Sequence, residues 1–174
     1  MTNVFDVVNL CDQVVGSYER DKVHKFNLFH RAVHILVFRP DGKLIIQQRS
    51  AKKDYDPFLW TSSCSGHVDC GEDYSTAAIR ECKEELGQFV SDLDLKEILR
   101  LSPCIYTGNE FVRVYFTHNS NAMYFNRNEI VQLKEESIIE IYRLVNTSPE
   151  IFSKSFIHIF CLLKSRLLHE RYLI

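Results

Sequence analysis

The chain has 174 residues, of which 45% are hydrophobic and 25% are charged, a composition typical of a soluble globular protein. A formal net charge of −2 gives no electrostatic argument for binding nucleic acid or membranes. The length predicts a single domain that spans residues 1–174.

The six cysteines are scattered along the chain without a CxxC pair, and the N-terminus lacks a basic segment followed by an apolar run. These features predict reduced thiols, no cysteine-bound zinc and a cytoplasmic location. The apolar run at 151–168 contains Lys154, Lys164 and Arg166. It therefore predicts an amphipathic helix on the domain and no membrane span.

The first part of the chain is predicted to form strands joined by short turns. β-branched and apolar residues between turn signals predict strands at 5–9, 13–18, 31–39 and 43–49, then an extended segment at 59–63. The segment 31–39 is apolar on both faces, as expected for a buried central strand. A Pro-Asp-Gly turn separates it from the next strand, and a loop precedes the extended segment.

A loop and then a helix are predicted next, with Asp73 as the N-terminal cap and Gly87 at the C-terminal end. Further strands are predicted at 95–106, 110–118 and 130–136, with a turn at 107–109, and further helices at 138–145 and 149–170. Strands that surround a central helix, with a helix at the end, favour an α/β fold. The predicted architecture is an α/β/α sandwich with a mixed β-sheet and a C-terminal helix.

Three glutamates share one face of the central predicted helix. At 3.6 residues per turn, Glu84 falls about 60° to one side of Glu81 and Glu85 about 40° to the other. Like charges at these spacings cost a helix about 0.2–0.5 kcal/mol per pair. A hard divalent cation such as Mg²⁺, which takes oxygen ligands, turns this repulsion into a binding site. For the glutamates alone, a solvated acidic face is the alternative interpretation.

The sequence around these glutamates is more specific. Residues 66–88 resemble the Nudix box, Gly-x5-Glu-x7-Arg-Glu-U-x-Glu-Glu-x-Gly-U, where U is a bulky apolar residue. Gln88 departs from the last apolar position. All seven fixed positions are matched, by Gly66, Glu72, Arg80, Glu81, Glu84, Glu85 and Gly87. The resemblance implies a Nudix domain that hydrolyses a nucleoside-diphosphate-X or another organic diphosphate, with Mg²⁺ or Mn²⁺ as cofactor.

The resemblance also implies metal ligands. They are the carboxylates of Glu81, Glu84 and Glu85 and the backbone carbonyl of Gly66. A divalent metal neutralises a diphosphate and lowers the pKa of bound water, which is the chemistry that this substrate class needs.

Arg80 and Glu72 would pair and orient these carboxylates, and the same pair would hold loop and helix together. The general base is either a box glutamate, such as Glu85, or an acidic residue of a later strand. Glu110 is the first later candidate, and Glu135 or Glu136 the second.

A narrower resemblance covers about residues 4–120. The segments VHKFNLFHRAVHILVF, GKLIIQQRS, FLWTSSCSGH and GNEFVRVY are similar to the Nudix branch that contains isopentenyl-diphosphate isomerases and isomerase-like hydrolases. By position, it implies a second metal site formed by His24, His30, His67 and Glu110. Imidazole and carboxylate together suit a transition metal or zinc.

Three departures argue against isomerase activity. Ser65 stands where the isomerases have a cysteine, and a serine hydroxyl is a far weaker acid than a thiol. The adjacent Cys64 would point to the other face of an extended chain. Gly108 replaces an acidic ligand two residues before Glu110, and the box is complete where isomerases relax it.

The favoured function is therefore hydrolysis of a small-molecule diphosphate, and two alternatives stay open. One is isopentenyl-diphosphate isomerisation, and the other is a catalytically silent domain that binds a diphosphate or a protein. Tyr55, Phe58 and Trp60 either line a substrate pocket or pack in the core. The sequence does not define the substrate or the oligomeric state.

Overall fold

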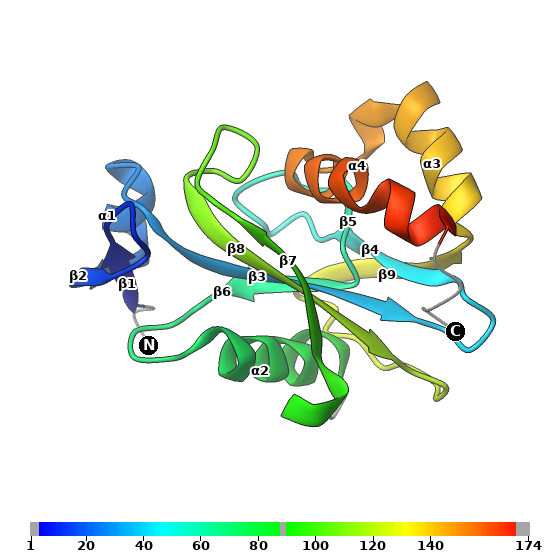
Figure 1. Cartoon of the computed structure of the whole chain (residues 1–174), viewed down its shortest axis with the longest axis horizontal. Helices are drawn as coiled ribbons and strands as arrows, with labels where there is room; N and C mark the ends of the chain where they lie inside the picture. Colours follow the sequence, from blue (N-terminus) through cyan, green and yellow to red (C-terminus); the bar gives the residue numbers. More distant parts are fainter. Residues whose placement is uncertain (1–3, 88–89, 170–174) are drawn as a thin grey trace.

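The computed structural model describes residues 4–87 and 90–169. A seven-stranded mixed sheet forms the centre, and a two-stranded hairpin lies beyond one end of it (Figure 1). The strands are β1 (Val4–Val8), β2 (Val14–Glu19), β3 (His30–Phe38), β4 (Leu44–Arg49), β5 (Trp60–Thr61), β6 (Cys64–His67), β7 (Lys96–Leu101), β8 (Glu110–His118) and β9 (Ile130–Glu136). The α-helices are α1 (Arg20–Lys25), α2 (Tyr74–Leu86), α3 (Ile138–Thr147) and α4 (Lys154–His169).

Helices cover both faces of the sheet. Figure 1 shows α2 on one side and α3 with α4 on the other. Alternate residues of β3 serve the two layers: Ala32 and Leu36 belong to the core that includes residues of α3 and α4, whereas Val33 and Ile35 belong to the core that includes residues of α2. This period of two is the one expected of a strand buried on both faces. The predicted α/β/α sandwich with a mixed sheet and a C-terminal helix is confirmed.

Along one edge, the central strand β3 pairs with two different strands, β6 and β4. On its other edge it runs parallel to β8, with His30 opposite Glu110. On the divided edge, β6 pairs with residues 32–35 and β4 pairs with residues 37–38, both antiparallel. The sheet therefore branches along β3, and α2 packs against both β6 and β3.

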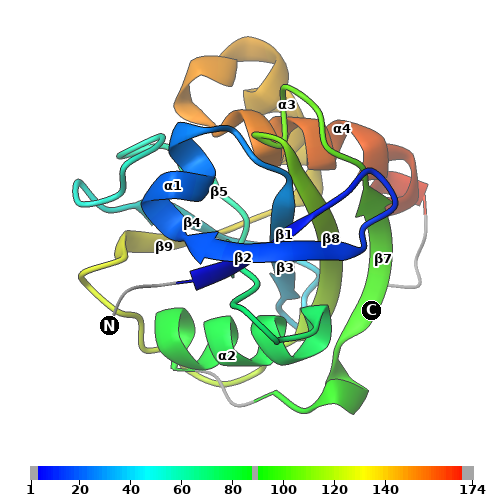
Figure 2. The same cartoon turned by 90° about the vertical axis from the view of Figure 1, so that its left-hand side faces the viewer.

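The hairpin of β1 and β2 packs with α1 at the end of the sheet where β3 begins, and it faces the viewer in Figure 2. Phe5, Val7 and Val23 form a small core between hairpin and helix. Asp12, in the hairpin turn, accepts hydrogen bonds from Arg31 of β3 and from the hydroxyl of Tyr74 on α2, which fixes the turn to the rest of the molecule.

Several predicted boundaries are wrong. The strand predicted at 95–106 ends at Leu101; residues 102–104 are irregular, and a turn at 105–109 leads into β8. The last helix begins at Lys154, not at Pro149, because a short 3-10 turn, η2 (Pro149–Ile151), precedes it; its predicted end at Glu170 lies outside the described residues. The box opens with strand β6 where a loop was predicted, and α1 was not predicted.

None of the helices in the described part of the chain has the length and apolar character that a membrane crossing requires. All six cysteines are free thiols, and Cys64 and Cys82 are buried.

Candidate functional site

The Nudix-box helix α2 is held at both ends as the sequence predicts. The side chain of Asp73 accepts a hydrogen bond from the amide of Thr76 at 2.8 Å, and Gly87 ends the helix in the left-handed conformation with φ of 59°. Left-handed backbone at a helix end favours glycine because other residues meet a steric penalty there. The two caps therefore fix where the helix begins and where it ends.

Glu81 and Glu85 converge on this face beside β6. Glu85 is 3% exposed and accepts hydrogen bonds from Gln47 Nε2 at 2.9 Å and from Lys53 Nζ at 3.2 Å. The burial of Glu81 and its nearness to Glu85 raise its pKa to about 8. The repulsion expected of these two carboxylates is therefore present, and a divalent cation between them would relieve it.

Gly66 allows the close approach of Glu81 to β6. A Cβ atom at this position would lie 2.1 Å from the carboxyl carbon of Glu81, which no real side chain tolerates. The absence of a side chain at Gly66 is thus a steric condition for the carboxylate to reach the strand.

Arg80 links the box loop to the helix. Its Nε and Nη2 donate to the two carboxylate oxygens of Glu72, both at 2.9 Å, and Nη2 also donates to the carbonyl of His67 at 2.9 Å. Nη1 donates to Glu81 at 2.7 Å. Burial would raise the pKa of Glu72, yet the hydrogen bond from Arg80 holds it below its ordinary value. The predicted Arg80–Glu72 pair is therefore formed, and it orients Glu81.

Glu84 lies further out than the other two glutamates of the face. Its side chain is 57% exposed and meets Arg80 at 3.3 Å. It does not belong to the tight group that Glu81 and Glu85 form with Cys64.

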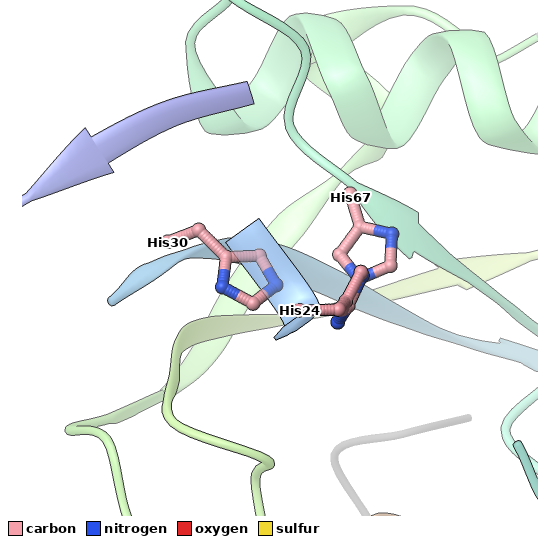
Figure 3. A group of neighbouring side chains, drawn as sticks. All are labelled: His24, His30 and His67. Atoms are coloured by element: carbon pink, nitrogen blue, oxygen red, sulfur yellow. The ribbon is translucent and has the colours of Figure 1, made fainter. Parts of the chain in front are cut away.

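A second group of side chains gathers on the opposite face of β6. His24 from α1, His30 from β3 and His67 from β6 each offer a ring nitrogen within 4.8 Å of the others, and the three rings lie next to one another (Figure 3). Glu110 joins them: its Oε1 lies 3.0 Å from Nε2 of His67 and 3.3 Å from Nε2 of His30. The four residues that the sequence assigns to a second metal site therefore meet in space.

The chemistry of this histidine cluster fits a metal ion. Nε2 of His24 and of His30 are buried and make no hydrogen bond; for His30 the approach to Glu110 is not aligned for one. Burial and the neighbouring His67 lower the pKa of His24 to about 4, so its imidazole is neutral and able to bind metal. Burial would raise the pKa of Glu110, but His30 and His67 lower it well below its ordinary value.

Because successive side chains of β6 point to opposite faces of the strand, the carboxylate group and the histidine cluster lie on different sides of it. Gly66 faces Glu81 on the α2 side, whereas the next residue, His67, faces Glu110 on the other side. Cys64 lies on the α2 side, as its two-residue spacing from Gly66 requires, so its thiol does not take the place of the Ser65 side chain.

The loop before β5 contacts both groups through Lys53, which the sequence did not single out, and through Tyr55, one of the predicted candidates for lining a substrate pocket. Lys53 reaches Glu85, and the ring of Tyr55 lies 5.7 Å from that of His24. Phe58 is exposed, whereas Trp60 is half-buried against the core. Lys53 carried no signal in the sequence because its approach to Glu85 depends on the fold.

Phe5 is a further residue that the sequence did not single out. It is 2% exposed and stacks on His30 with ring centroids 5.8 Å apart and an interplanar angle of 4°; its centroid is 4.6 Å from that of His67. The N-terminal hairpin therefore covers the histidine cluster and restricts its rings.

The fold separates the three later glutamates that were candidates for the general base. Glu110 belongs to the histidine cluster, but Glu135 and Glu136 do not approach either group. They pair in register with Ile45 and Leu44 at the far end of β4, and Glu135 binds Arg39 at 2.7 Å. The structure thus removes both as candidates for the general base.

Comparison with known proteins identifies the class of domain to which this fold, with its carboxylate group and its histidine cluster, belongs. The family model described as NUDIX domain matches residues 28–154, so the chain belongs to the NUDIX family.

Isopentenyl-diphosphate Delta-isomerase 2 of Photorhabdus laumondii is 29% identical over 158 residues, 88% of each chain. An uncharacterized Nudix hydrolase of Nostoc is 31% identical over 130 residues, 74% of this chain and 77% of that protein. A crystal structure of a Deinococcus radiodurans protein superimposes with a TM-score of 0.81 at 26% identity, covering 91% of this chain and 98% of that one. These relatives place the chain near both the isomerases and the hydrolases of the family.

Proposed function

We propose that the protein is a metal-dependent hydrolase that cleaves the diphosphate linkage of a small molecule, a nucleoside-diphosphate-X or another organic diphosphate. The observation that supports this most directly is the convergence of Glu81 and Glu85 on the side-chain-free position of Gly66. Two carboxylates held this close, one of them with its pKa raised to about 8, favour a divalent cation over a purely structural role.

The residues present fit the Mg²⁺ or Mn²⁺ that the family implies. Glu81, Glu85 and the carbonyl of Gly66 would hold the ion, and Glu84 would join from the exposed side of α2. When bound, the ion would supply charge neutralisation for the diphosphate and a water of lowered pKa. Arg80, fixed by Glu72, keeps Glu81 in position for this purpose.

Positive charge beside the carboxylates suits an anionic substrate. Lys53 contacts both Glu85 and Glu129, and the partly buried Arg49 lies close enough to Glu85 to interact with it electrostatically. A diphosphate that enters next to Glu85 would exchange these internal ion pairs for contacts with its own oxygens. We propose that Lys53 and Arg49 help to bind the diphosphate.

The contacts of Glu110 favour a role as a metal ligand over a role as the general base. One of its oxygens is shared between His30 and His67, and its pKa is lowered, which makes it a weak proton acceptor. We therefore assign Glu110 to a second metal centre with the three histidines, and we assign the base to the box glutamates, with Glu85 as the candidate.

Isopentenyl-diphosphate isomerisation is the second candidate function, and the formed histidine cluster favours it. Two local features oppose it. Ser65 offers a weak acid at the position of the isomerase cysteine. Gly108 has a φ of 65°, a conformation that glycine adopts without steric cost, and it offers no carboxylate to serve as the extra ligand.

An assay of product chemistry separates the candidates. The protein is incubated with Mg²⁺ or Mn²⁺ and a panel of diphosphates that includes isopentenyl diphosphate, and phosphate release and double-bond position are both followed. Monophosphate or phosphate products support the hydrolase. An isomerised alkene without phosphate release would replace it with the isomerase. Ligand-induced stabilisation without any turnover would indicate a binding domain.

A further inference from the structure

Phe58, in the loop before β5, has a backbone conformation that rarely accommodates a bulky side chain. Its φ of 64° lies in the left-handed region, where Cβ crowds the following carbonyl oxygen. Among the described residues, the other non-glycine residues with a positive φ are aspartates and asparagines, whose short polar side chains tolerate this region. They are Asp12, Asn27, Asp56 and Asn109. Phe58 is therefore the bulky exception among them.

The local hydrogen bonds explain why the chain needs this conformation here. The amide of Leu59 donates to the carbonyl of Asp56 at 3.2 Å, so residues 56–59 form a β-turn with Pro57 and Phe58 at its centre. The amide of Phe58 donates to the carbonyl of Arg49, and the amide of Arg49 donates to the carbonyl of Leu59, both at 3.0 Å. Two residues thus oppose one, as in the β-bulge whose first position is normally a left-handed glycine. Phe58 occupies that glycine position.

Burial of the ring does not compensate for this strain. Phe58 is 56% exposed, and it belongs to none of the three hydrophobic cores of the described residues. Tyr55 in the same loop is 58% exposed. The backbone around both rings is fixed, because Gln48 Nε2 donates to the carbonyl of Phe58 at 2.9 Å and Arg49 Nε donates to that of Tyr55 at 3.0 Å. A strained residue whose side chain stays outside the core indicates a functional demand on that side chain.

The surroundings of Phe58 indicate the kind of group that its ring would contact. The same loop carries Lys53, which lies 3.2 Å from Glu85, so a diphosphate bound there would lie beside the loop. Gln132 Nε2 donates to Gln48 Oε1 at 2.9 Å, and Gln48 in turn donates to the carbonyl of Phe58. An exposed aromatic ring with amide groups on neighbouring residues suits a nucleobase, which stacks through its face and forms hydrogen bonds at its edge. An apolar tail would gain less from such an open, polar setting.

We propose that Phe58 is a specificity-determining residue whose ring stacks on the base of a nucleoside diphosphate, so that the substrate is a nucleoside-diphosphate-X and not a diphosphate with an apolar tail. The turn holds the ring outside the fold, next to the diphosphate that Lys53 would bind, at a cost in stability. The inference rests on the proposed function only in placing a diphosphate at Glu85 and Lys53.

Binding of non-hydrolysable probes tests the proposal. Calorimetry with Mg²⁺ measures the affinity for the α,β-methylene analogues of adenosine, guanosine, cytidine and uridine diphosphates and of isopentenyl diphosphate. Methylenediphosphonate, which mimics the diphosphate without an organic group, is the reference. The proteins are the wild type, Phe58→Ala, Phe58→Gly and Phe58→Tyr. Tyr142→Ala is the control, because Tyr142 is a 40% exposed aromatic residue of α3, on the opposite side of the sheet from α2 (Figure 1).

We expect at least one nucleoside probe to bind the wild type at least roughly tenfold more tightly than methylenediphosphonate. Phe58→Ala and Phe58→Gly should lose most of this preference, whereas Phe58→Tyr, which keeps a ring, and Tyr142→Ala should retain it. Equal affinity of the wild type for the nucleoside probes and for methylenediphosphonate overturns the proposal, and so does a preference that survives Phe58→Ala. A preference that depends on Phe58 but favours the isopentenyl analogue also overturns it.

Melting temperatures test the strain at the turn. Alanine and glycine both remove the ring, but glycine alone adopts a φ of 64° without steric cost. Phe58→Gly should therefore melt roughly 2–8 °C above Phe58→Ala. Equal melting temperatures would contradict the strained turn, and the proposal with it.

Hydrolysis by the wild type with Mg²⁺ is measured separately, so the two proposals can fail independently. Nucleoside binding that depends on Phe58, in a protein without diphosphate hydrolysis, would support the role of Phe58 and overturn the hydrolase. Hydrolysis without a nucleoside preference would overturn the role of Phe58 alone.

Discussion

Replacing Glu81 by glutamine should stabilise the metal-free protein at neutral and alkaline pH. Glu81 has a pKa of about 8 in the folded state, raised from 4.5 by burial and by Glu85. Because the folded value lies above the unfolded one, the ionised carboxylate favours unfolding. The free energy of unfolding of the wild type should fall as the pH rises from about 4.5 through 8. Glutamine carries no charge, so this fall in the free energy of unfolding should be absent from Glu81→Gln.

The magnitude follows from the interval between the two pKa values. At about 1.4 kcal/mol for each pH unit, the upper limit at pH 8 is roughly 4–5 kcal/mol. Buried sites behave as though their effective dielectric constant were about 20, so we expect a gain of about 1–3 kcal/mol for Glu81→Gln. Near pH 4.5, where the wild-type carboxyl is neutral in the fold, the gain should vanish.

Urea unfolding of the wild type and Glu81→Gln, in a chelator and across pH 5 to 9, measures this difference. Glu150→Gln is the control, because Glu150 is exposed in η2 on the opposite side of the sheet from α2. Adding Mg²⁺ should stabilise the wild type far more than Glu81→Gln. If the two proteins lose stability in parallel from pH 5 to 9, the inferred repulsion between Glu81 and Glu85 is wrong.

Three other substitutions probe the site. Gly66→Ala would force Glu81 away from β6, so turnover should fall at least roughly a hundredfold while circular dichroism shows the fold retained; near-normal turnover would contradict the role of Gly66. Arg80→Lys cannot reproduce the two-pronged contact with Glu72, so the melting temperature should fall by about 3–8 °C in calorimetry, and an unchanged value would count against that contact. His30→Ala should reduce tightly bound Mn²⁺ or Zn²⁺ from about two to about one equivalent per chain by elemental analysis. An unchanged metal content would argue against the histidine centre.

The box helix could be predicted from sequence because its determinants are local. The cap at Asp73, the stop at Gly87 and the spacing of Glu81 and Glu85 all act within a few residues, and the structure reproduces each of them. The α1 helix was missed because six residues are too few to show a helical period.

The contents of the site were harder to predict, because they depend on strand pairing. Glu135 and Glu136 were the second candidates for the general base after Glu110, but the register of β9 on β4 places them at the far end of β4. Phe5 and Lys53 reach the two groups only through the hairpin and the loop before β5. A one-residue shift of β6 would exchange the faces of Gly66 and His67, and nothing local to the box fixes that register.

The most direct test of the account is to run the reaction in isotopically labelled water with Mg²⁺ and a diphosphate substrate, and to follow the label into the products by phosphorus NMR. For the proposed hydrolysis, the label should appear in a phosphate product of the wild type, and Glu85→Gln should lower its rate of appearance at least roughly a hundredfold. Glu135→Gln, which alters a carboxylate bound to Arg39 away from the site, should match the wild type. Isomerised alkene with no labelled phosphate, or equal rates in the wild type and Glu85→Gln, would contradict it.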